Sequence, residues 1–258
     1  MKIQWTGTAG FKIQSRDASF LIDPYLSRNA RAWPVQTIKP KDLAPFSHIF
    51  VSHGHFDHIL DIPDIVNPTD ARVVCSPVVA RTLIKMGMAR SHLMEIKNCG
   101  DDICFAHIQA TAFFSRHIRF DAKLLISTLI RAGKQIKNIL PLLKNYPCGQ
   151  VLSWRFKLEG KRILFFGTGG STRAELEMLA KDPVDLLLVP LQGHSDICAR
   201  AMAYVKALKP AFVLPHHQDN FFPPVSRAVD ITPFIKQVNL QCPGTKIVSM
   251  DFNDTIEL

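Results

Sequence analysis

The sequence predicts an α/β fold in which strands and helices are arranged in layers. Strand-like and helix-like stretches alternate through all 258 residues, and such alternation is typical of layered α/β proteins. The composition, with 47% hydrophobic and 21% charged residues, is that of a globular protein and excludes a disordered tail, a fibre or a mini-protein. No internal repeat of roughly 20 to 50 residues is visible. We therefore expect one domain over residues 1–258.

The first half of the chain is expected to contain five short strands. In each of them, β-branched and aromatic residues lie between turn-forming residues. A helix is expected at 78–86, where apolar residues recur every three to four positions. The strands are expected at 2–6, 10–14, 19–22, 48–51 and 72–75.

The second half repeats this alternation after a strand-like run at 108–114. Its helices are recognised by the same periodicity and its strands by the same bounded apolar runs. The helices are expected at 173–180, 196–207 and 228–238, and the strands at 151–157, 162–166, 185–189, 211–214 and 246–249.

A basic amphipathic helical insertion is expected at 120–147. Within 122–146 apolar residues follow one helical stripe and basic residues the other side, and Pro141 should kink the helix or divide it in two. Residues 115–162 hold eleven basic and two acidic residues, so the rest of the chain is neutral. The insertion is either a helix packing its apolar face on the domain, or a lid or docking helix for an anionic ligand or membrane surface. The stripe comprises Leu125, Leu129, Ala132, Ile136, Ile139, Leu140 and Leu143.

Three features of the sequence favour a cytoplasmic protein. The six cysteines form no C-x-x-C pair, which argues against a disulfide framework or a cysteine zinc site. The N-terminus runs directly into strand-like sequence without the pattern of a signal peptide. The longest apolar runs fall far below the roughly 18 residues that a transmembrane helix needs.

The residues that carry chemistry are concentrated at 53–58, which read H-x-H-x-D-H directly after an expected strand. Imidazole nitrogens and a carboxylate are ligands that suit zinc, with manganese and iron as alternatives. His53 and His55, two apart on an extended chain, can point the same way. Asp57 and His58, after the chain turns, can address a second position nearby. The competing interpretation is a polar loop that is rich in histidine by chance.

Further ligands must come from other strand ends. His117 follows a strand-like run and is expected to complete the first position; the alternative is a basic surface residue. His216 and His217 follow an apolar run, and one of them should complete the second position. His194 is a candidate substrate contact in a loop whose other expected role is to cap the next helix.

The H-x-H-x-D-H pattern resembles the metallo-β-lactamase superfamily. Other stretches are similar to landmarks of its branch that contains the L-ascorbate phosphate lactonase and the N-acyl-phosphatidylethanolamine phospholipase D. The resemblance implies a four-layer αβ/βα sandwich of metallo-β-lactamase type, with the metals at one edge between two sheets. It also implies that His217 rather than His216 is the ligand. The landmarks are residues 5–11, 22–25, 52–53 and 215–221.

Two positions depart from the family pattern. Thr168 stands where the family usually has the aspartate that bridges the metals, and Thr8 stands where it has a histidine. Because a threonine hydroxyl is neutral and a weak ligand, the bridge is either lost or replaced by water.

These residues predict a metal-dependent hydrolase with one or two zinc ions. Three histidines at the first position leave a fourth coordination site open, as in catalytic zinc sites, while the second position holds its ion less tightly. A metal-activated water, oriented by Asp57 with His58 beside it, is expected to attack an anionic small-molecule or lipid-like ester, lactone or phosphodiester. Arg116 and Arg119 are candidate contacts for the negative charge of the substrate. The expected metal ligands are His53, His55, Asp57, His58, His117 and His217.

The alternatives are a nuclease and a non-catalytic or mononuclear metal-binding member of the fold. Nucleic acid is disfavoured as a partner because basic and aromatic residues are not interleaved as single-strand binding requires. Peripheral membrane contact through 122–146 is compatible with either activity. The sequence leaves the oligomeric state, the substrate and the effect of Thr168 open.

Overall fold

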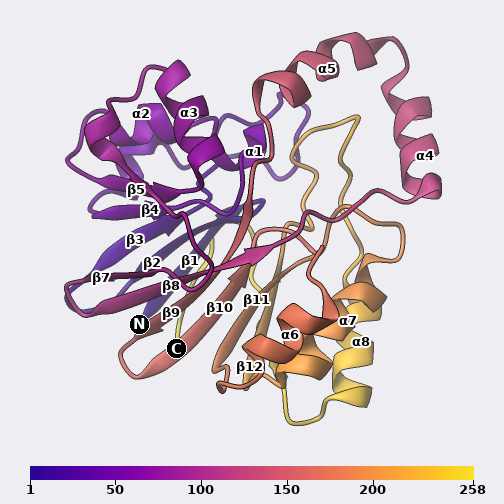
Figure 1. Cartoon of the computed structure of the whole chain (residues 1–258). Helices are drawn as coiled ribbons and strands as arrows, with labels where there is room; N and C mark the ends of the chain where they lie inside the picture. The colour runs from indigo at the N-terminus through magenta and orange to yellow at the C-terminus, as the bar shows by residue number, and fades with distance from the viewer.

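Two seven-stranded mixed sheets pack face to face (Figure 1). The computed structural model describes residues 1–258 except the side chain of residue 138. The first sheet has the order β14-β1-β2-β3-β4-β5-β6, so strands from both ends of the chain pair in it. Its strands are β1 (Lys2–Gly7), β2 (Gly10–Gln14), β3 (Ser19–Ile22), β4 (His48–Phe50), β5 (Arg72–Cys75), β6 (Leu93–Glu95) and β14 (Thr255–Glu257).

The second sheet has the order β13-β12-β11-β10-β9-β8-β7. Strands β7 to β10 pair antiparallel, whereas β10 to β13 pair parallel. Its strands are β7 (Asp102–Phe105), β8 (Ile108–Ser115), β9 (Val151–Leu158), β10 (Lys161–Phe166), β11 (Leu186–Pro190), β12 (Phe212–His216) and β13 (Lys246–Ile247).

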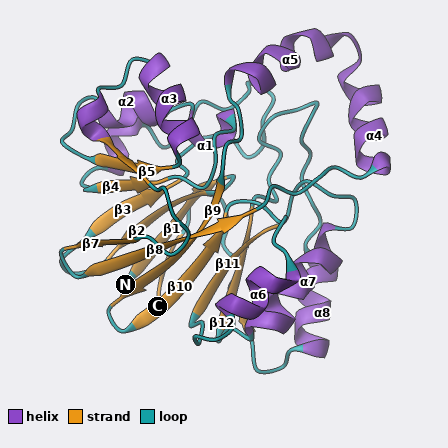
Figure 2. Ribbon diagram, in the orientation of Figure 1, coloured by secondary structure: helices purple, strands orange, loops and turns teal.

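The helices cover the outer faces of the two sheets, with α1 to α3 beside the first sheet and α6 to α8 beside the second (Figure 2). This confirms the predicted four-layer αβ/βα sandwich. Helices α4 and α5 stand apart from these layers, beyond the end of the sheets (Figure 1). The helices are α1 (Phe56–Ile59), α2 (Ile62–Val66), α3 (Pro77–Lys85), α4 (Ala122–Ala132), α5 (Ile136–Asn145), α6 (Arg173–Leu179), α7 (Ile197–Leu208) and α8 (Thr232–Gln241), and short 3₁₀ turns lie at Pro40–Leu43, Arg90–His92 and Gly133–Gln135.

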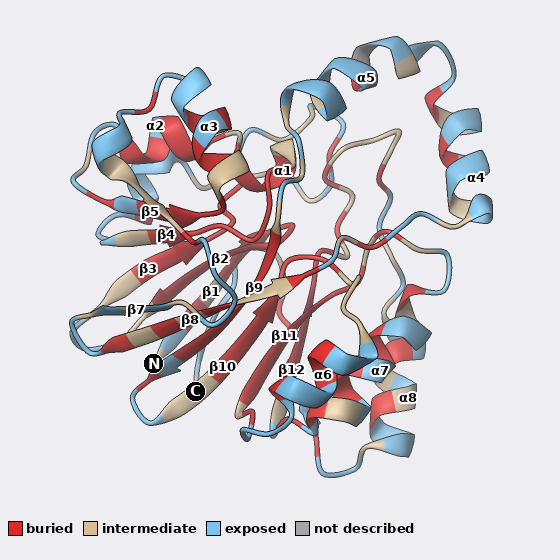
Figure 3. Ribbon diagram, viewed as in Figure 1, coloured by how far each residue is buried: buried red, intermediate tan, exposed pale blue. Residues whose placement is uncertain are grey.

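The main core lies between the sheets and contains buried side chains from strands of both. Much of these strands is buried (Figure 3). Aromatic rings form much of it: Phe20 packs on Phe156 with ring centroids 4.7 Å apart, and Phe50 meets Trp154 edge to face at 5.0 Å. Burial of each such side chain stabilises the fold by roughly 1.5–3 kcal/mol. The bounded apolar strands of the sequence are therefore explained by burial.

The parallel strands end together at one edge of the sandwich. Ile22 at the end of β3 pairs with Phe50 at the end of β4, and Pro190 at the end of β11 pairs with His216 at the end of β12. The loops that follow these strands therefore converge. Such convergence at strand ends is a common origin of binding sites in α/β proteins.

Several expected elements have different limits in the structure. The helix expected at 228–238 begins only at Thr232, with Pro233 in its first turn, where a proline is tolerated. The expected strand at 246–249 is reduced to two residues. The insertion divides at Gly133, whose φ of 47° favours glycine, rather than at Pro141, which lies inside α5. No helix among the described residues is long and apolar enough to span a bilayer.

The orientation of α4 also differs from that of an ordinary helix that packs its apolar stripe on the protein. Leu125 and Leu129, members of the expected apolar stripe, are 47% and 48% exposed. Ala132, the third member of the stripe on α4, is buried, and so is the polar Thr128 beside it. On α4, therefore, only Ala132 of the stripe packs fully on the protein, whereas Ile139 of α5 is buried as expected.

Candidate metal centre

The segment 53–58 passes from the end of β4 into the short helix α1, and His55 is the N-cap residue of that helix. Its course requires a glycine at position 54. A Cβ atom there would lie 2.2 Å from the carbonyl oxygen of Pro147, and the Gly54 N–H donates to the carbonyl of Cys148 at 2.8 Å. The backbone that leaves α5 thus holds the turn between the first two histidines.

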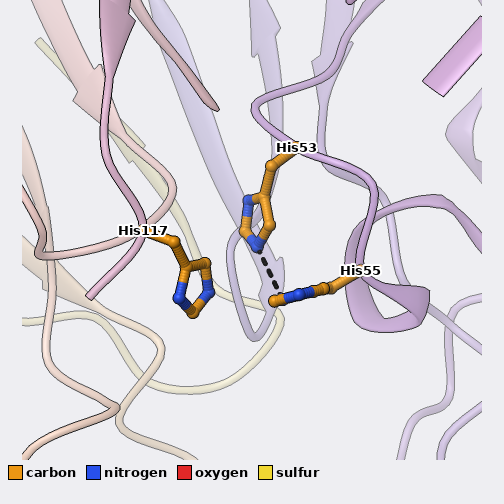
Figure 4. A group of neighbouring side chains, drawn as sticks. All are labelled: His53, His55 and His117. Atoms are coloured by element: carbon orange, nitrogen blue, oxygen red, sulfur yellow. Dashed lines mark hydrogen bonds between the residues drawn. The ribbon is translucent and has the colours of Figure 1, made fainter. Parts of the chain in front are cut away.

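Three imidazoles form the first ligand group, His53, His55 and His117, with one ring nitrogen of each within 4.8 Å of the others. Figure 4 shows the three rings close together, His53 and His55 from one segment and His117 from a separate stretch of chain. Nε2 of His53 lies 3.1 Å from Nδ1 of His55. Their rings lie 5.0 and 4.5 Å, respectively, from that of His117.

The second ligand group consists of Asp57, His58 and His217, all buried. Oδ2 of Asp57 lies 3.6 Å from Nε2 of His58 and 3.5 Å from Nε2 of His217. Burial would raise the pKa of Asp57, but the neighbouring imidazoles outweigh it and hold that pKa well below its usual range. Asp57 is therefore an anion at neutral pH and a suitable ligand for a divalent cation.

The chemistry of both groups fits metal ions. Burial lowers the pKa of His53 and His55 and lowers that of His117 to about 4, so these imidazoles are neutral at pH 7, the form that binds metals. The first group contains no carboxylate, so its converging neutral nitrogens have no acidic partner within the group. Their lone pairs are suited to bind a cation. The structure thus brings together the residues that the spacing assigned to each position; their role as ligands stays a prediction.

Partners behind the rings fix which nitrogen faces the centre. Nδ1 of His58 lies 2.7 Å from Oδ2 of the buried Asp23, and the Ser52 hydroxyl contacts both Asp23 and, at 2.9 Å, Nδ1 of His53. Nδ1 of His117 lies 2.6 Å from the carbonyl oxygen of Ile118. Such contacts orient ligands and leave Nε2 of each ring free for a metal.

Asp23 is the functional residue that the sequence reasoning did not assign. It accepts the backbone N–H of Ser52 at 2.7 Å in addition to its contact with His58. Burial would lower the pKa of His58, but Asp23 and Asp57 outweigh it and raise that pKa. The available signal was a lone aspartate directly after the strand 19–22, beside the strand that leads to the histidines.

The two adjacent histidines after β12 have different surroundings. The ring of His216 stacks on Phe165 and meets Phe11 edge to face inside the core, and neither of its nitrogens has a hydrogen-bond partner among the described residues. His217 adopts a φ of 63°, donates its N–H to the Thr8 carbonyl at 2.9 Å and points toward Asp57. His217, the residue implied by the resemblance, is the one that reaches the centre.

Both departures from the family pattern lie near the centre. Thr168 is buried after β10 and lines the same cavity as the two ligand groups, and its hydroxyl oxygen accepts the Ile118 N–H at 3.1 Å. Thr8 donates its N–H to Asp219 at 3.1 Å, and Asp219 also pairs with Arg28. Thr168 therefore presents a neutral side chain where an anionic bridge was expected.

A cavity of about 280 Å³ opens over the two groups. No lysine or arginine lines it among the described residues. Apart from the ligands, Thr168 and Gln192, its side chains are mostly apolar. The walls include Phe56, Ile118, Phe120, Ile139, Leu142, Leu143, Tyr146, Phe221, Phe222 and Val225.

The three candidate substrate contacts lie outside this cavity. Arg116 and Arg119 line a separate, more polar cavity next to His117. His194 accepts the Asp196 N–H at 3.0 Å, which leaves it in the role of a loop-ordering residue. The structure does not bring these side chains to the two ligand groups, and their contact with a substrate stays a prediction.

The sequence and fold are similar to those of metal-dependent hydrolases. A model of the β-lactamase superfamily domain matches residues 18–218. A UPF0173 metal-dependent hydrolase of Pyrococcus furiosus is 27% identical over the whole of both chains, and one of Carboxydothermus hydrogenoformans is 30% identical over 86% of each. The structure of a metallo hydrolase from Ignicoccus hospitalis superposes with a TM-score of 0.72 at 20% identity, covering 99% of this chain and 97% of the other.

Proposed function

The chain belongs to the β-lactamase superfamily and is a metal-dependent hydrolase, and from this premise we propose that it cleaves an ester, lactone or phosphodiester whose reacting group is anionic and which carries an apolar portion. The observation that carries the proposal is the cavity: two ligand groups lie against walls that are otherwise apolar. The particular branch of the superfamily, the cytoplasmic location and zinc as the metal stay predictions.

Preference for an anionic reacting group comes from the ligand set. Asp57 is the single carboxylate among the six proposed ligands, so it offsets only one unit of the positive charge that one or two divalent cations would bring. A positive centre inside a cavity of low polarity attracts negative charge. When bound, the ions would supply an activated water and polarise the bond to be broken.

The side chains around the centre have separate proposed roles. The Asp57 carboxylate accepts a hydrogen bond from the attacking water and so orients it. His58, fixed by Asp23, keeps Asp57 ionised. The Thr168 hydroxyl, whose oxygen accepts from Ile118, has its proton free to donate to the substrate.

The apolar walls bind the rest of the substrate and exclude water from the reacting bond. Ile139 and Leu142 on α5 line the cavity together with Phe222, and none of the three side chains offers a polar atom. Because Arg116 and Arg119 lie elsewhere, a polyanionic nucleic acid finds no basic walls here. The nuclease alternative is therefore disfavoured.

The test is hydrolysis of para-nitrophenyl esters of increasing acyl length and of bis-para-nitrophenyl phosphate by the zinc-loaded protein. We expect kcat/KM for the esters to rise roughly fourfold for each CH₂ that the cavity buries. Replacement of Phe222 by alanine should reduce this dependence on chain length. A rate that does not depend on acyl length would contradict the apolar part of the proposal.

The matched histidine variants are His55→Ala and His107→Ala. His55 belongs to the first ligand group, whereas His107 lies on the surface, outside both groups. Since loss of a residue behind a metal ligand typically costs 10- to 100-fold, loss of the ligand itself should lower turnover by at least about 100-fold. Equal activity of the two variants, with circular dichroism unchanged, would refute a role for the first group.

A further inference from the structure

Helix α4 presents an apolar face to solvent. Ile126 and Ile130, one turn apart, are 57% and 76% exposed, and Leu125 and Leu129 lie on the same side of the helix. The side that faces the protein carries the buried Thr128 and Ala132. Most of α4 is exposed (Figure 3). An amphipathic helix of a globular protein normally has the opposite orientation.

Specific bonds hold α4 in this orientation. The Arg131 side chain donates from Nε to the Pro224 carbonyl at 3.1 Å and from Nη2 to the Val225 carbonyl at 3.2 Å. At the other end of the helix, Asp121 accepts the backbone N–H and the hydroxyl of Ser195. Because both ends are attached, the helix cannot turn its apolar face inward without losing these bonds.

The same segment is strongly basic. Residues 122–146 contain five basic residues and no acidic one. Four of the five, Lys123, Lys134, Lys137 and Lys144, are exposed. An exposed apolar stripe beside lysines is the composition of helices that lie in the interface of an anionic bilayer.

A second segment adds apolar surface beside the insertion. Arg31 donates from Nη2 to the side chain of Gln135 at 2.9 Å, which joins the loop around residues 29–35 to the turn between α4 and α5. Trp33 and Val35 on this loop are 67% and 64% exposed. An indole ring is favoured at the boundary between lipid and water.

We propose that the insertion and the Trp33 loop dock the protein on an anionic lipid bilayer. The complementary charge selects this occupant over a second copy of the chain, because a symmetric contact between two insertions would place lysines against lysines. Leu143 both lines the cavity and is exposed, so the docked protein has the cavity mouth next to the lipid. This docking does not depend on the reaction that the centre performs.

The experiment is co-sedimentation of the full chain with phosphatidylcholine vesicles that contain or lack phosphatidylglycerol. We expect binding only to the anionic vesicles. Since each basic residue near such a surface contributes about 1 kcal/mol, the double variant Lys134→Gln/Lys137→Gln should bind roughly 30-fold more weakly. The matched control, Lys181→Gln/Lys206→Gln, changes two exposed lysines outside the insertion and should bind as the unaltered chain does.

The apolar face is tested by Ile126→Ser/Ile130→Ser, with Leu240→Ser as its control because Leu240 is an exposed leucine on α8. The first should lose binding and the second keep it. Trp33 supplies an independent signal, since Trp5 and Trp154 are buried: its emission should shift to the blue with anionic vesicles, and Trp33→Phe should abolish the shift.

Three results would overturn the proposal. The first is absence of sedimentation with anionic vesicles. The second is equal binding by Ile126→Ser/Ile130→Ser and Leu240→Ser. The third is a dimer in solution that Ile126→Ser/Ile130→Ser dissociates, with neither dimer nor monomer binding to vesicles. The last would assign the apolar face to a second copy of the chain. Ester hydrolysis is measured without vesicles, so its outcome is independent of these three results. The docking and the proposed activity can therefore fail separately.

Discussion

The metal centre and the insertion differ in what holds their side chains in place. At the centre, Asp23 and Ser52 fix imidazole rings from behind; the second ligand group and His53 are buried, and the other two histidines are half-buried. In α4 the polar bonds hold the helix ends, and the apolar side chains extend into solvent. Contacts within the chain thus account for the geometry of the centre, whereas the exposed apolar face of α4 is the feature that the proposed docking on a bilayer accounts for. This difference can be measured, because substitutions in the two regions should have unequal effects on stability.

Among substitutions at the centre and in the insertion, the largest effect is expected for Asp23→Asn. The Asp23 carboxylate accepts hydrogen bonds from the Ser52 backbone, the Ser52 hydroxyl and His58. An asparagine side chain has only one oxygen, so its NH₂ group would face at least one of these donors. We expect the free energy of unfolding to fall by about 3 kcal/mol and the metal content to fall with it. Urea unfolding of metal-free protein and elemental analysis would measure the two effects.

The control for Asp23 is Asp64→Asn on the exposed side of α2. It should change stability by less than about 0.5 kcal/mol, as surface substitutions usually do. If Asp23→Asn lowered the free energy of unfolding equally little, Asp23 would not stabilise the histidines of the centre. The centre and the insertion would then not differ in this respect.

A smaller effect on stability, but a clear one on metal content, is expected for Thr168→Asp. The present hydroxyl is neutral and already accepts the Ile118 N–H, so it offers no anionic bridge between the two groups. Protein purified without added metal should contain about one ion per chain, and the aspartate variant about two, as in bridged two-metal sites. Two ions in the unaltered chain would show that the bridge is dispensable.

The smallest effect is expected in the insertion. Because Ile126 and Ile130 are exposed, Ile126→Ser/Ile130→Ser should change the free energy of unfolding by no more than about 0.5 kcal/mol per site. By contrast, Ile62→Ser removes a fully buried side chain from α2 and should cost at least roughly 3 kcal/mol. Thermal unfolding of both variants tests this. A large loss for the α4 variant would mean that its apolar face has a partner within the chain.

Much of the fold and of the candidate site follows from local patterns. Short apolar runs between turn residues predict strands, because strands buried between two sheets need apolar side chains. The residues just after such runs, His117 and His217 among them, lie at one edge of the sandwich. His53 and His55 share a direction because side chains two apart on an extended chain do so. Asp23 could not be assigned from the pattern alone, since its role depends on the pairing of β3 with β4.

Periodicity could not reveal how the insertion is placed. An apolar stripe identifies an amphipathic helix, but it does not say whether the stripe meets the protein or something else. That depends on distant bonds such as those from Arg131 to Pro224 and Val225. The local sequence also did not predict where the insertion divides. Pro141 is accommodated within α5, while Gly133 takes the backbone conformation that ends α4.

The order of the ligands along the chain has a consequence for biosynthesis. All three ligands of the first group have been synthesised once residue 117 is added, whereas the second needs His217, a hundred residues later. At ribosomal rates of about 5–20 residues per second, that interval lasts roughly 5–20 s. Strand β12, which carries His217 at its end, must also pair with β11 before the second group can close. A nascent chain thus contains all three imidazoles of the first group well before it contains the last ligand of the second.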